Sequence, residues 1–222
     1  MRIRGAIFDV DGTLLDSMFI WDTIGESYLR SIGYEPKENL NEAFKSMSLY
    51  QAACYYQSHY DVTLTTGAIM DGVNALLERY YRYEVLLKPG AAELAAGLQA
   101  EGVRLCIATA TDRHLVEAAL SRLGILPYFS SIFTCTEVGH GKDEPHIFEE
   151  ALRFLGTKKE ETLVLDDAFY AVQTAKKAGF PVAAVYDPYE KDQEGLRRLA
   201  DLYLEDLSQL RRKAAAEQEA ER

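Results

Sequence analysis

Cysteine is scarce in this chain of 222 residues. The three cysteines, Cys54, Cys106 and Cys135, are odd in number and far apart, and none belongs to a C-x-x-C pair. This spacing is not that of a thiolate metal site. We therefore expect three small, buried thiols in a protein of a reducing compartment, the cytoplasm.

Long apolar runs are also missing. The apolar start of MRIRGAIFDVDGTLLD is interrupted by carboxylates well before signal-peptide length. No segment approaches the ~20 apolar residues that a membrane span needs. The sequence therefore predicts neither a signal peptide nor insertion into a membrane.

Positive charge is in deficit. Lys and Arg number 24 against 35 Asp and Glu, which gives a formal net charge of −11. A surface of this sign repels polyanions, so a nucleic acid is not an expected partner. An anionic small molecule would need a local positive centre, which a metal ion and one or two well-placed cations could supply.

Four short apolar runs predict buried parallel strands. Hydrophobic residues make up 48% of the chain and charged residues 27%, as in ordinary globular proteins. Amphipathic helices follow most of the runs, and a fifth run, SSIFTC, predicts a further strand. This alternation indicates a doubly wound α/β sheet whose ligand site lies beyond the carboxyl ends of the strands. The four runs are IRGAIFDV, VRLCIATA, TLVLDD and PVAAVYD.

The long segment between the first and second runs contains no comparable strand. Its apolar stripes predict several helices instead, among them MFIWDTIGESYLRSIG and LYQAACYYQSHY. We therefore predict an α/β core over residues 1–16 and 84–210, with a helical cap domain inserted over residues 17–83. The charged stretch 211–222 is expected to be a frayed surface tail.

Four carboxylates come directly at the ends of two predicted strands. Asp9 and Asp11 close the first run, and Asp166 and Asp167 close the third. The segment DVDGT by itself could be an ordinary tight turn. At one edge of a sheet, however, four acids resist joint ionisation unless a cation lies among them. Oxygen ligands without nearby His or Cys favour a hard ion such as Mg²⁺.

Groups suited to phosphate follow the other predicted strands. The second run ends in Thr109, Ala110 and Thr111, whose hydroxyls and backbone N–H groups can hold phosphate oxygens. Lys142, in the loop GHGKDEP, is a candidate counter-charge. Together with the acids, these groups predict a site for phosphate transfer.

In this order the segments resemble the motifs of the haloacid dehalogenase (HAD) superfamily. FDVDGTLLDS is similar to its first motif, LCIATAT to its second, the Lys142 loop to its third and LVLDDA to its fourth. The resemblance is to the subfamily with a helical cap after the first strand, which contains β-phosphoglucomutase-like and phosphoglycolate phosphatase-like enzymes. It covers nearly the whole chain, and four motifs in order are far more specific than one.

The resemblance implies a role for each matching residue. Asp9 would be the nucleophile that forms an aspartyl-phosphate. Asp11 would protonate the leaving oxygen and later deprotonate the attacking water. Mg²⁺ would be held by Asp9, the backbone carbonyl of Asp11, Asp167 and, directly or through water, Asp166. The phosphoryl oxygens would be held by Thr109, Ala110 and Lys142.

The superfamily contains more than one reaction. Dehalogenases lack the second aspartate of the first motif, so the presence of Asp11 favours phosphoryl transfer. β-Phosphoglucomutase-like members carry a His near the start of the cap and an Arg in a later cap loop that grips the second phosphate. By alignment these positions are Trp21 and Leu49. We therefore prefer a phosphatase acting on a small phosphorylated metabolite, as a monomer or weak homodimer, over a phosphomutase. A non-catalytic protein that binds a phosphorylated ligand is the third alternative, because a fold does not guarantee activity.

The cap and the third motif contain unusual residues. The many aromatic residues of the cap are expected to fill its core, unless some stack on a flat leaving group such as a nucleoside or flavin. Among them Trp21 is the candidate substrate contact, because it lies close behind the catalytic loop. Asp143, Glu144 and His146 depart from the usual third motif. The two acids either pair with Lys142 or project into water.

Overall fold

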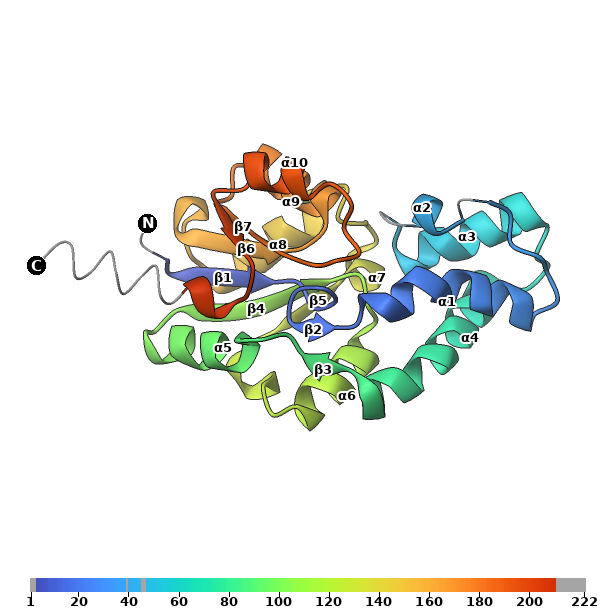
Figure 1. Ribbon diagram of the computed structural model, residues 1–222, viewed down its shortest axis with the longest axis horizontal. Helices are drawn as coiled ribbons and strands as arrows, with labels where there is room; N and C mark the ends of the chain where they lie inside the picture. Colours follow the sequence, from blue (N-terminus) through green and yellow to red (C-terminus); the bar gives the residue numbers. More distant parts are fainter. Residues whose placement is uncertain (1–2, 39, 45–46, 211–222) are drawn as a thin grey trace, which may run out of the picture.

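The computed structural model describes residues 3–38, 40–44 and 47–210, so the predicted tail lies outside the described residues. The chain forms a larger α/β domain and a smaller helical domain that lie side by side (Figure 1). In the part of the chain that the structure describes, no helix is long and apolar enough to cross a membrane.

A six-stranded parallel sheet forms the centre of the larger domain, with strand order β5-β4-β1-β6-β7-β8. The predicted doubly wound α/β fold is thereby confirmed. The five predicted runs each supply one strand, and β8 adds an edge strand that the apolar pattern does not predict. The strands are β1 (Gly5–Phe8), β4 (Arg104–Thr109), β5 (Ile132–Thr134), β6 (Thr162–Asp166), β7 (Val182–Val185) and β8 (Leu202–Leu204).

Helices cover both faces of the sheet, as the buried strands at its centre require. Successive side chains of β1 point to opposite faces, so Ala6 and Phe8 pack into one core cluster and Ile7 into the other. Helices α5 (Ala91–Ala100) and α6 (Arg113–Arg122) belong to the first cluster. The second contains α8 (His146–Leu155), α9 (Phe169–Lys177) and α10 (Gln193–Leu199). Short helices join the strands at α7 (Cys135–Val138) and at the 3₁₀ turns Leu126–Tyr128 and Lys159–Glu161.

The cap is inserted between two very short strands that pair with each other. Strands β2 (Leu15–Asp16) and β3 (Leu86–Leu87) form an antiparallel ribbon where the chain leaves and re-enters the core. Both connections between the two domains therefore run through this ribbon. The cap helices are α1 (Met18–Ser31), α2 (Leu40–Phe44), α3 (Leu49–Tyr60) and α4 (Thr66–Arg79), and a π-helical turn, Tyr80–Glu84, continues α4.

Aromatic side chains fill much of the cap interior. Tyr28 and Tyr56 are buried against each other, and Phe44 packs edge-on to Tyr56 with ring centroids 5.0 Å apart. A capping box begins α3, because the hydroxyl of Ser48 accepts from the backbone N–H of Gln51 and the Gln51 side chain accepts from the N–H of Ser48. This cap fixes the start of the helix beside the aromatic core.

The expectation of three buried thiols is wrong for one cysteine. Cys106 and Cys135 are buried, but Cys54 is only partly covered. Cys106 lies in the central strand β4, whereas Cys54 lies beside the buried face of helix α3, which is formed by Ala52, Ala53, Tyr56 and Tyr60.

Candidate active site

The carboxyl ends of two adjacent strands, β1 and β6, bring three of the four predicted acids together. Strand β1 lies between β4 and β6, and parallel strands end at the same edge of the sheet. Asp9 follows β1, while Asp166 ends β6 and Asp167 comes next. Each of the three carboxylates is buried and offers one oxygen, and these oxygens lie within 4.8 Å of one another.

Lys142 reaches this cluster from the loop before α8. Its ammonium Nζ lies 2.5 Å from Oδ1 of Asp9 and 2.8 Å from Oδ2 of Asp166, and only 3% of the side chain is exposed. The lysine is therefore a buried counter-charge that bridges two carboxylates. The side chain of Asp143 is exposed to water, and the carboxylate of Glu144 lies beside His140 and His146. Neither of these acids therefore pairs with Lys142.

The cluster carries strongly shifted pKa values. Burial raises the pKa of Asp9 to about 7, although Lys142 lowers it, and the nearby carboxylates add to the increase. The pKa of Asp167 is also raised, chiefly by burial and next by Asp166. Burial disfavours the charged ammonium of Lys142, but the carboxylates outweigh this, so its pKa lies well above the usual value. One cation, Lys142, therefore faces three buried acids. A bound positive ion would be electrostatically favourable at this cluster.

The backbone of the first motif approaches the cluster closely. Thr13 donates a hydrogen bond of 3.1 Å from Oγ1 to Oδ1 of Asp167. Gly12 has a φ of 76°, and a Cβ at this position would lie 2.3 Å from Oδ2 of Asp167. Only glycine therefore leaves room beside that carboxylate. Three buried oxygen ligands next to an uncrowded backbone fit a hard divalent cation such as Mg²⁺.

A second lysine, the partly buried Lys88, also contacts the first-motif loop. Lys88 Nζ donates to the carbonyl of Gly12 at 2.6 Å, to the carbonyl of Tyr186 at 2.6 Å and to Oδ2 of the fully buried Asp187 at 2.8 Å. Sequence reasoning missed both charged residues. Asp187 follows strand β7 just as Asp9 follows β1, so its position at a strand end was a usable signal.

Asp11 lies in a separate hydrogen-bond network between core and cap. Its Oδ1 accepts from Ser17 Oγ at 2.6 Å and from Tyr81 OH at 2.5 Å, and its Oδ2 accepts from Thr111 Oγ1 at 2.5 Å. Trp21 in turn donates from Nε1 to the Tyr81 hydroxyl at 2.9 Å. The sequence pointed to Asp11, Thr111 and Trp21, but gave no reason to select Ser17 or Tyr81.

Not all of the predicted phosphate-binding residues line the cavity. Thr109 is completely buried, and its Oγ1 accepts from the backbone N–H of Thr111 at 3.1 Å. Ala110, Thr111 and Lys142 line the cavity beside the acid cluster. The hydroxyl of Thr109 therefore shapes the end of β4, while Thr111 presents its side chain toward the site.

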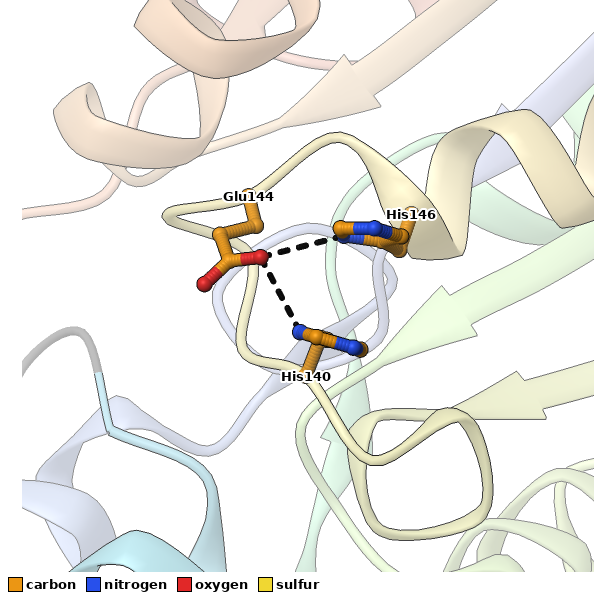
Figure 2. Close-up of side chains that lie close together, drawn as sticks. All are labelled: His140, Glu144 and His146. Carbon is orange, nitrogen blue, oxygen red and sulfur yellow. Dashed lines mark ion pairs between the residues drawn. The ribbon is translucent and has the colours of Figure 1, made fainter.

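Two histidines and a glutamate meet on the loop that carries Lys142 (Figure 2). Nδ1 of His140 and Nδ1 of His146 lie 3.0 Å and 3.1 Å from the same oxygen, Oε2 of Glu144. The two rings are stacked, with centroids 4.0 Å apart and planes inclined by 15°. Since ring-nitrogen lone pairs lie in the ring plane, one ion cannot be coordinated well by both of these nearly parallel rings. These contacts are better explained as structural, because they link His140, Glu144 and His146 across this half-exposed loop.

A cavity extends from the acid cluster into the cap. Asp9, Asp11, Asp166 and Asp167 line its core end, and Trp21 is one of the cap residues at its other end. The catalytic candidates, the phosphate-binding candidates other than Thr109 and the proposed cap contact therefore share one cavity.

Comparisons with known proteins agree with this arrangement. The chain is 27% identical over 218 residues to the protein CbbY of Rhodobacter capsulatus, covering 94% of this chain and 95% of the relative. It is 28% identical over 210 residues to a probable pseudouridine-5'-phosphatase of Drosophila melanogaster, covering 90% of each. The crystal structure of CbbY from Rhodobacter sphaeroides in complex with phosphate superimposes with a TM-score of 0.81 at 25% identity, covering 94% of this chain and 96% of that one.

A family model described as haloacid dehalogenase-like hydrolase matches residues 3–179, which include all the acids of the cluster, Asp11 and Lys142. This match covers most of the chain, and the fold and the order of the motifs are those that the resemblance implied. The chain therefore belongs to the haloacid dehalogenase-like hydrolases.

Proposed function

We propose that this protein is a Mg²⁺-dependent phosphatase that hydrolyses a small organic phosphate monoester through an aspartyl-phosphate on Asp9. The observation that carries the proposal is the buried cluster of Asp9, Lys142, Asp166 and Asp167 at the floor of a cavity. The reaction class is phosphate-ester hydrolysis, since this family contains phosphatases among the relatives of the chain.

The metal site in this proposal consists of oxygen ligands. Asp9, Asp167 and the backbone carbonyl of Asp11 would hold Mg²⁺, with Asp166 acting directly or through water. When bound, the ion supplies positive charge that offsets the charges of the nucleophile and the phosphoryl group. The raised pKa values of Asp9 and Asp167 support this assignment, because they report buried negative charge that lacks compensation.

The chain's own residues perform the bond changes. An Asp9 carboxylate oxygen attacks phosphorus, and the bond between phosphorus and the ester oxygen breaks. Asp11 gives its proton to the leaving alkoxide, so an alcohol departs. Asp11 then takes a proton from water, whose oxygen attacks the phosphorus and releases inorganic phosphate from Asp9. The Ala110 backbone and Lys142 hold the phosphoryl oxygens, and closure of the cap excludes bulk water.

A phosphomutase is less well supported than a phosphatase. The two cap positions that hold a second phosphate in mutase-like relatives correspond to Trp21 and Leu49, and both line the cavity. Of the described cap residues that line it, none is Lys, Arg or His. Among the described cap residues, a second phosphate would therefore find no cationic partner in the cavity lining.

Phosphate release is the direct test. Purified protein is incubated with a panel of phosphorylated metabolites in Mg²⁺ or in chelator, and inorganic phosphate is measured. We expect release that depends on Mg²⁺. Interconversion of sugar phosphates without release, followed by ³¹P NMR, would support the mutase. A thermal shift with Mg²⁺ and phosphate but without turnover would support the binding protein.

Replacing Tyr81 by phenylalanine tests the support of Asp11. The change deletes one of three hydroxyls that donate to this carboxylate. Because a hydrogen bond to a charged group contributes about 1.5–3 kcal/mol, we expect kcat to fall about 10- to 100-fold, with KM changed little. Tyr83→Phe is the matched control, since Tyr83 is 73% exposed. Equal kcat in both variants would contradict the role of Tyr81 as a positioning residue.

A further inference from the structure

The cap end of the cavity is apolar. Its lining side chains include Met18, Trp21, Ile24, Phe44, Met47 and Leu49. They come from helix α1, helix α2, the segment before α3 and the start of α3, so four parts of the cap contribute apolar surface to the cavity. The leaving alcohol of a bound ester would lie against this surface, because the phosphate must lie at the acid cluster.

The polar atoms of the aromatic cap residues that line the cavity are already used within the protein. Trp21 donates from Nε1 to Tyr81 OH, and Tyr56 donates from its hydroxyl to the carbonyl of Gly25 at 2.7 Å. These aromatic rings therefore offer faces and edges to a ligand, but no spare hydroxyl or N–H donor. Contacts with these rings stabilise the hydrocarbon part of a ligand, but they do not provide hydrogen-bond partners for its hydroxyl groups.

Outside the acid cluster and Lys142, the charged lining residues Glu190 and Lys191 lie in the segment after β7, and Asp22 lies on helix α1 of the cap. Glu190 accepts from the backbone N–H of Phe169 at 3.0 Å and from that of Asp192 at 2.9 Å. Its carboxylate therefore links the start of helix α9 to the segment before helix α10. Asp22 and Lys191 also line the cavity, and each makes an interaction within the protein. A polyhydroxylated alcohol would have to place hydroxyls against the apolar cap side, at a cost for each one left without a partner.

We propose that the leaving group of the substrate is apolar. The substrate is then the phosphate monoester of an aliphatic or aromatic alcohol rather than of a polyhydroxylated sugar. This inference rests on the proposed phosphatase activity and adds the substrate class to it. The apolar part contacts Met47 and Leu49, and Trp21 covers it on the side of the catalytic loop.

Linear alkyl phosphates from ethyl to hexyl test the substrate class. Their leaving alcohols differ little in acidity, so kcat/KM reports contact with the cavity rather than intrinsic reactivity. Each methylene buried against the cap is expected to raise kcat/KM about fourfold, until the cavity is filled. Glucose 6-phosphate is expected to react at least about tenfold less efficiently than the best alkyl ester, because its hydroxyls lose partners in the cap.

Two polar variants test whether Met47 and Leu49 contact the leaving group. Met47→Gln and Leu49→Asn keep approximate size, and each is expected to reduce the hexyl-to-ethyl ratio of kcat/KM at least about threefold. Leu64→Asn is the control, because Leu64 is an exposed cap residue outside the cavity lining. Melting temperatures of all three variants report their folding.

The outcomes separate the two proposals. An increase in kcat/KM with chain length that weakens in the two polar variants supports the apolar leaving group. Release of phosphate that is independent of chain length, or that is fastest from polyhydroxylated esters, overturns the substrate class and leaves the phosphatase intact. No release from any ester overturns both.

Discussion

Replacing Asp9 by asparagine is expected to lower turnover by at least about 10⁴-fold, as removal of a nucleophile does in enzymes with covalent intermediates. The amide keeps the shape of the side chain but cannot form the aspartyl-phosphate. It also removes the negative charge that lies 2.5 Å from Lys142 Nζ. The measurement is the Mg²⁺-dependent release of phosphate at saturating substrate.

The fold of this variant can be checked separately. Asp9 is a buried carboxyl whose pKa burial raises to about 7, so its negative charge at pH 8 is unfavourable when metal is absent. We expect Asp9→Asn to melt in chelator at a temperature no lower than that of the wild type. Asp71→Asn, at an exposed position of helix α4, should retain full turnover. Turnover in Asp9→Asn within tenfold of the wild type would exclude Asp9 as the nucleophile.

The parts of the fold that could be predicted from the sequence are those with a strong local pattern. Strands β1, β4, β6 and β7 are apolar and almost completely buried, so their runs stand out from the polar segments around them. Edge strand β8, Leu202–Leu204, is only partly buried and lies among acids, and the pattern there is too weak to predict it. The ribbon of β2 and β3 has two residues in each strand, which is too short to show alternation.

In the candidate site, too, the residues that could be predicted are those with a local sequence pattern. Asp9, Asp166 and Asp167 could be predicted because carboxylates at the ends of neighbouring parallel strands must meet. Tyr81 could not, because it is 70 residues from Asp11 and reaches it only after the cap folds back on the core. Lys88 pairs with Asp187 across 99 residues, and this pairing also depends on tertiary structure.

Replacing Lys142 by methionine is expected to destabilise the metal-free protein by about 3–5 kcal/mol at pH 8, because it leaves two buried carboxylates without their cation. Lys142 lies 2.5 Å from Asp9 and 2.8 Å from Asp166, and Asp166 is almost completely buried. Methionine preserves most of the length and the apolar part of the lysine side chain. Urea denaturation in chelator measures the loss, and Lys177→Met is the control, since Lys177 is exposed on α9.

The loss should depend on pH in a defined direction. The pKa of Asp9 is raised from 3.8 to about 7 in the folded protein, chiefly by burial. Its contribution to stability is therefore fully present below pH 3.8 and is lost as pH rises through about 7. Without Lys142 the carboxyl keeps its proton to higher pH, so the variant continues to lose stability where the wild type has levelled off. The penalty of Lys142→Met should thus be smaller at pH 5.5 than at pH 8. A loss that is equal at the two pH values would contradict a role of Lys142 as the counter-charge of Asp9.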